Sequence, residues 1–122
     1  MESDGSTNDF DVENYISENY AIDNMHYTTD TWENEDTGRT EYIVSIHPDS
    51  EELGQEIDGI FKNGSHLDDE RTRTLFEIAE EILIDLPQIN NKIHIESVIW
   101  KADEEVEFPI LLIQDYQQST IE

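Results

Sequence analysis

The sequence predicts an α+β fold in which helices lie on one face of a four-stranded antiparallel or mixed sheet. The first observation behind this prediction is a stretch over residues 67–86 whose apolar side chains recur at a helical period. The second is a set of strand-like runs that form two hairpins on either side of a pair of helices: residues 25–32, 41–47, 92–101 and 108–116. A short N-terminal helix precedes them.

Residues 67–86 are the longest segment with a single period, and they indicate a helix with one apolar and one acidic side. Asp68 and Asp69 place negative charge at the expected helix start, where the helix dipole is positive. Pro87 is expected to end the helix because proline cannot continue the helical hydrogen bonding. The apolar stripe should lie on the core, and it consists of Leu75, Phe76, Ile78, Ala79, Ile82, Leu83 and Leu86.

The first predicted helix and the first hairpin come before this segment. The helix is predicted to begin near residue 9, with Asp9 or Asp11 as its cap. Residues 25–32 are rich in Thr and aromatic side chains, which suit a strand. Residues 33–38 supply a turn to the next strand. The apolar positions of the helix recur at helical spacing: Val12, Tyr15, Ile16 and Tyr20.

The second helix of the chain is predicted after Pro48. Asp49 and Glu52 resemble a capping box, which opens a helix, and Gly64 supplies a C-terminal stop. Its apolar line is Leu53, Ile57, Ile60 and Phe61.

The last two strands differ in their patterns. In residues 92–101 one face should carry Ile93, Ile95 and Ile99, alternating with other side chains. Residues 108–116 contain a nearly continuous apolar run, which predicts partial burial on both faces. Pro109 should lie at the start of this strand or on an edge, because it has no amide hydrogen to donate.

The charge balance is the most unusual property of the sequence. Six Lys and Arg stand against 31 Asp and Glu, and the formal net charge is −25. Such a chain repels nucleic acid and anionic membranes and attracts basic surfaces. There is no cysteine, no apolar run of the roughly 20 residues that span a membrane, and no signal-peptide core. We therefore expect a soluble cytoplasmic protein with one domain over residues 9–116, and tails at 1–8 and 117–122.

The sequence shows no pattern of catalytic or metal-ligating residues. Three of the four histidines have a carboxylate two residues later, which so acidic a chain produces by chance: His47, His66 and His94, but not His26. No HExxH motif, nucleophile elbow or phosphate-cradling glycine loop is present. We expect no enzymatic activity, no cofactor and no bound metal. Trp32 and Trp100 fit a core or, alternatively, an interface anchor.

The candidate binding site is a face of carboxylates on the two central helices. Acidic positions on the outer side of residues 67–86 repeat at about 6 Å along the helix axis. This spacing is of the scale at which a nucleic-acid backbone presents its phosphates. It predicts an inhibitor that occupies the basic surface of a nuclease or DNA-binding protein, as a DNA mimic, an anti-restriction or anti-CRISPR protein, or an immunity protein does. The expected partner-binding residues are Glu52, Glu56, Glu70, Glu77, Glu81 and Asp85.

A second interpretation stays open, in which the acidity is an adaptation to molar salt and the protein has an unrelated adaptor function. The composition resembles that of small phage-encoded anti-defence proteins. The scarcity of Lys also resembles proteins of salt-loving archaea, although the abundance of Ile and Asn is less typical of them. A homodimer is compatible with either interpretation.

Overall fold

The computed structural model describes residues 11–102 and 109–115. This part of the chain confirms the predicted α+β fold with a short N-terminal helix. The expected tails, and the outermost residues of the first helix and the last strand, lie outside the described residues. The elements in chain order are α1 (Val12–Asn19), β2 (Met25–Asn34), β3 (Arg39–Pro48), α2 (Glu51–Asn63), α3 (Glu70–Ile89), β4 (Ile93–Trp100) and β5 (Ile110–Gln114).

The four strands form one mixed sheet in the order β2-β3-β4-β5. β2 pairs with β3 and β4 pairs with β5 in antiparallel fashion, as predicted. Gly38 lies in the turn between β2 and β3 with a φ of 75°, which glycine adopts at no steric cost. β3 and β4 pair in parallel, because α2 and α3 form the long crossover that parallel neighbours require. Of the two predicted alternatives, the mixed sheet is therefore the one that forms.

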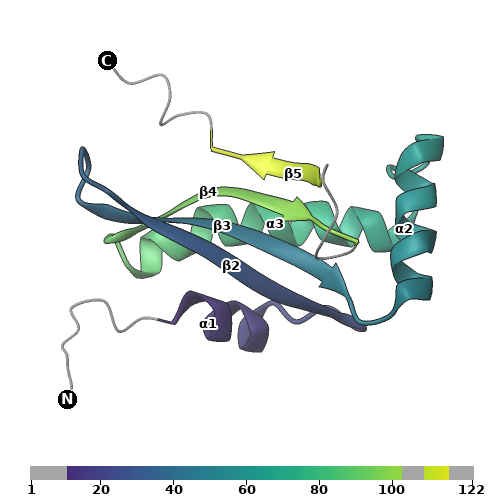
Figure 1. The fold of residues 1–122 in the computed structure, drawn as a ribbon, viewed down its shortest axis with the longest axis horizontal. Coiled ribbons are helices and arrows are strands. Elements are labelled where there is room, and N and C mark those ends of the chain that lie inside the picture. The colour runs from purple at the N-terminus through teal and green to yellow at the C-terminus, as the bar shows by residue number, and fades with distance from the viewer. Residues whose placement is uncertain (1–10, 103–108, 116–122) are drawn as a thin grey trace.

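α3 covers one face of the sheet, where it packs against β4 and β5, and Figure 1 shows it behind the strands. α1 adds Val12 and Ile16 to the same hydrophobic core. The sheet face that is turned toward the viewer in Figure 1 carries no helix among the described residues. The buried apolar residues of α3 have the predicted spacing: Leu75, Ala79, Ile82 and Leu86. They pack with apolar residues of β3 and β4, namely Val44, Ile46, Ile93, Ile95, Val98 and Trp100.

A short polar side chain caps the start of each helix. Of the two candidates for α1, Asp11 is the cap. Ser50 caps α2, so the capping box predicted from Asp49 and Glu52 is wrong by one residue, because Ser50 is the extended residue directly before the first helical turn. Asp69 caps α3, which therefore begins three residues later than predicted.

Pro87 does not end α3, because the helix continues to Ile89. A proline within a helix removes the hydrogen bond of its own missing amide, and its ring crowds the carbonyl four residues earlier. The following turn still closes, since the amide of Asn90 donates to the carbonyl of Leu86 at 3.0 Å. The predicted helix end at residue 86 is therefore wrong by three residues.

A bulge in β4 changes which of its side chains face the core. The pairing of β4 with β3 skips Glu96, so this residue is extra in β4 and shifts the alternation by one. Beyond the bulge, Val98 and Trp100 are buried in the core, whereas Ile99 is only half-buried. The prediction that Ile99 shares a face with the two earlier isoleucines is therefore wrong.

β5 is an edge strand, and Leu112 is the one buried residue of its five. Leu111 is exposed. The predicted burial on both faces is therefore wrong for the described part of this strand, because α3 covers only one face of the sheet. Pro109 lies directly before the strand, as its missing amide hydrogen predicts.

α2 packs closely against the end of β3 through Gly54, which provides a stability test. A Cβ atom added to Gly54 would lie 3.1 Å from Cγ of Pro48, whereas a Cβ atom on Gly59 would meet nothing within 4 Å. We expect Gly59→Ala to raise the free energy of unfolding by about 0.5–1 kcal/mol through helix propensity. The free energy of unfolding of Gly54→Ala should be about 1–2 kcal/mol lower than that of Gly59→Ala, because the added methyl group overpacks the contact with Pro48. Urea unfolding of both variants measures this difference, and equal effects would contradict the close packing.

Candidate functional site

The outward side of α3 carries a row of exposed carboxylates. Glu70, Glu77 and Glu81 are exposed there. Glu80, which the sequence prediction left out, is exposed as well. Ile84 lies three and four residues beyond Glu81 and Glu80, a spacing that makes side chains neighbours on a helix, and 47% of its surface is exposed. We call the set of Glu77, Glu80, Glu81 and Ile84 the α3 ridge.

Asp85, the last residue of the predicted row, is half-buried. Its carboxylate accepts a hydrogen bond from the hydroxyl of Tyr20 at 2.9 Å. Burial, together with the hydrogen bond and the charge of Asp85, raises the pKa of Tyr20 well above its ordinary value. Asp85 therefore holds the end of α1 against α3, and the exposed row ends at Glu81.

The carboxylates of α2 form a second group. Glu52 and Glu56 are both exposed, and Glu56 accepts a hydrogen bond from Nη1 of Arg71 at 2.8 Å. Arg71 also donates to Asp69 from Nε at 3.3 Å. The hydrogen bonds from the side chain and the backbone of Arg71 lower the pKa of the Asp69 carboxyl. A basic residue therefore neutralises part of the acidic surface where α2 meets α3.

The six predicted residues do not lie on one line. α2 stands at one end of the sheet and runs across the direction of α3 (Figure 1). The carboxylates therefore divide into a pair on α2 and a row on α3, with Asp85 turned toward α1. The sequence could not predict this division, because the direction of α2 depends on its packing against β3 and α3.

The histidines pair with carboxylates that are distant in sequence. Nδ1 of His26 lies 2.7 Å from Asp49 at the surface. The ring of His94 lies between Glu41 and Asp115, with each ring nitrogen 2.6 Å from a carboxylate oxygen. In residues 11–102 and 109–115, no group of three or more histidine and carboxylate side chains is arranged to hold a metal ion.

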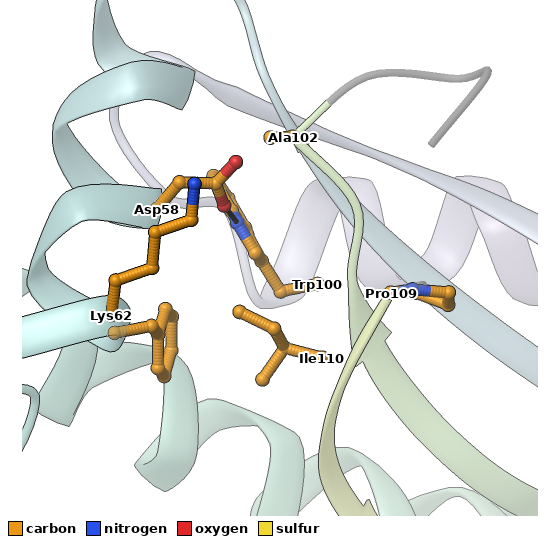
Figure 2. Close-up of a pocket in the computed structure, with 7 residues that line it drawn as sticks. Asp58, Lys62, Trp100, Ala102, Pro109 and Ile110 are labelled. Carbon is orange, nitrogen blue, oxygen red and sulfur yellow. Dashed lines mark hydrogen bonds between the residues drawn. The ribbon is translucent and has the colours of Figure 1, made fainter. Parts of the chain in front are cut away.

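A groove of about 460 Å³ opens between α2 and the start of β5 (Figure 2). The indole Nε1–H of Trp100 donates to Oδ1 of Asp58 at 3.1 Å, and only 1% of Trp100 is exposed. Trp100 is therefore a core residue, whereas Trp32 on β2 is 44% exposed and keeps the alternative of an interface anchor. The groove is lined by Asp58, Phe61, Lys62, Trp100, Ala102, Pro109 and Ile110.

Comparisons of the chain with protein-family models, with curated proteins and with solved structures find no match. Within the part of the chain that the structure describes, no helix is long and apolar enough to cross a bilayer. The fold and the surface together define an α+β protein whose helical side is acidic.

Proposed function

We propose that the protein is a non-enzymatic inhibitor that binds and blocks the basic, nucleic-acid-binding surface of a partner protein. DNA mimics, anti-defence proteins and immunity proteins against nucleases act in this way. The observation that supports the proposal most is the α3 ridge. Its three carboxylates lie within two helical turns of the exposed Ile84 on one helix, so a partner would meet several negative charges and one apolar contact together.

Charge and apolar contact contribute differently to such binding. The net charge of −25 attracts a basic protein over a range of about 8 Å at physiological ionic strength, which raises the association rate. Exposed charge pairs add only about 0–1 kcal/mol each. Burial of the exposed part of Ile84 adds about 1 kcal/mol that salt does not screen. The ridge therefore combines rapid capture with a short-range contact.

A second candidate is that the acidity maintains solvation in molar salt and that the protein is an adaptor. Exposed acids on elements other than α3 favour this candidate, because a mimic that binds through the α3 ridge does not need them. They include Glu13 and Glu18 on α1 and Glu33, Glu35 and Asp36 in the first hairpin.

The proposal is tested by capture of a partner and by the block that follows. Immobilised protein is incubated with cell lysate at about 0.15 M salt, where surface charges still act over about 8 Å. We expect a nuclease or a DNA-binding protein to be retained and its binding to DNA to be blocked. Retention of no basic protein would contradict the proposal and favour the adaptor.

A matched pair of variants locates the contact. Glu77→Gln with Glu81→Gln should weaken capture about tenfold, because two interface charges are lost. Glu33→Gln with Glu35→Gln makes the same change of charge in the first hairpin and should weaken capture much less. Equal losses in the two variants would mean that total charge, and not the α3 ridge, determines binding.

A further inference from the structure

The groove shown in Figure 2 combines apolar walls with one carboxylate that has an open hydrogen-bonding position. Phe61 on α2 and Ile110 on β5 are half-buried and line the groove. Oδ1 of Asp58 accepts the indole hydrogen of Trp100. Oδ2 of Asp58 has no hydrogen-bond partner in the part of the chain that the structure describes. The groove therefore offers a contact to a ligand that is apolar along its length and cationic at its end.

We propose that this groove binds an arginine side chain that the basic partner presents, an inference that rests on the proposed function. The aliphatic stem of an arginine would pack on Ile110 and Phe61. Its guanidinium can stack on the Phe61 ring and donate to Oδ2 of Asp58, a combination that arginine makes better than lysine. The net charge of −25 favours a cationic ligand over an anionic one.

Lys62 allows a test of the charge of the ligand that the groove binds. This residue lines the same groove, one helical turn beyond Asp58, and makes no ion pair within 4.0 Å among the described residues. Its charge opposes an incoming guanidinium. Removal of the Lys62 charge should therefore tighten binding, whereas removal of the Asp58 charge should weaken it. An anionic ligand would show the opposite pattern.

The substitution Asp58→Asn tests the carboxylate without disturbing the fold. The side-chain oxygen of asparagine can still accept the hydrogen bond from Trp100, while the negative charge is lost. The indole hydrogen of Trp100 reports directly on the groove, because its acceptor is the residue that would hold the ligand. Its NMR signal is separated from that of Trp32 by the variant Trp32→Phe.

The experiment is an NMR titration of the isotope-labelled full chain with a capped Gly-Arg-Gly peptide at about 0.15 M salt. We expect a saturable shift of the Trp100 indole signal, and no such shift with a citrulline peptide, which has the same shape but no charge. Asp58→Asn should weaken binding about tenfold, Lys62→Gln should tighten it about twofold to threefold, and Glu35→Gln in the first hairpin should leave it unchanged.

The proposal is overturned by the absence of a saturable shift, by an equal shift with the citrulline peptide, or by equal binding to wild type and Asp58→Asn. These outcomes are separate from a failure of the proposed function. If the peptide fails to bind while a basic partner is still captured, the groove inference is wrong and the inhibitor function stands. If the peptide binds as expected but no basic partner is captured, the groove stands and the inhibitor function is wrong.

Discussion

Replacing Ile82 by alanine is expected to lower the free energy of unfolding by about 2–5 kcal/mol. Ile82 is fully buried in the core between α3 and the sheet. The substitution removes apolar surface and leaves a cavity that packed neighbours close only in part. Urea unfolding followed by circular dichroism measures the loss, and the slope against urea should stay unchanged if the unfolded state is unaffected.

Glu81→Ala is the matched control for this prediction, because Glu81 directly precedes Ile82 in the sequence but lies on the exposed side of α3. It should change the free energy of unfolding by less than about 0.5 kcal/mol. Similar losses in both variants would contradict the assignment of the two sides of α3.

Phe76 belongs to the same predicted stripe, but it is half-buried beside Phe61 and His66. Phe76→Ala should therefore destabilise less than a fully buried phenylalanine would.

Replacing His94 by alanine should destabilise the protein by about 3–5 kcal/mol, because it removes the donor between two carboxylates. The side chain of Glu41 is 1% exposed and that of His94 is 5% exposed, and the ring of His94 is 2.6 Å from both Glu41 and Asp115. The substitution would leave the buried carboxylate of Glu41 without its contact to the ring of His94. Urea unfolding checks the size of the effect.

His26→Ala is the control for the buried cluster. The side chains of His26 and Asp49 are 47% and 53% exposed, although they are also in contact at 2.7 Å. Water can solvate the Asp49 carboxylate after the substitution, so the loss should be below about 1 kcal/mol. Equal losses for His26→Ala and His94→Ala would mean that burial does not control the strength of these contacts.

The parts of the fold that local pattern determines could be predicted from the sequence. The helical period of Leu75, Ala79, Ile82 and Leu86 located the core side of α3, and the turn at Gly38 located the first hairpin. The bulge at Glu96 could not be predicted, because it depends on the register with β3. Because of this bulge, Val98 and Trp100 face the core in place of Ile99.

The candidate site was predictable only within a single helix. The exposure of Glu77 and Glu81 follows from the period of α3, and the same period would have found Glu80. The half-burial of Asp85 depends on Tyr20, which is 65 residues away in the sequence. The carboxylate at the groove likewise meets Trp100 from 42 residues away. Contacts of this kind have no local pattern and arise from tertiary packing.

The two candidate functions differ in what they require at ordinary ionic strength. An inhibitor that acts by capture must be folded at about 0.15 M salt, where its charges attract a partner over about 8 Å. A protein adapted to molar salt need not be folded there, and it is expected to gain stability as the salt concentration rises through the molar range.

The direct measurement is therefore thermal unfolding of the full chain, followed by circular dichroism over a series of KCl concentrations from about 0.15 M upward. An acidic inhibitor predicts a cooperative unfolding transition at about 0.15 M, with only modest gains in stability at molar salt. A chain that is unfolded at about 0.15 M and folds only above about 1 M KCl would contradict the inhibitor function and assign the acidity to salt adaptation.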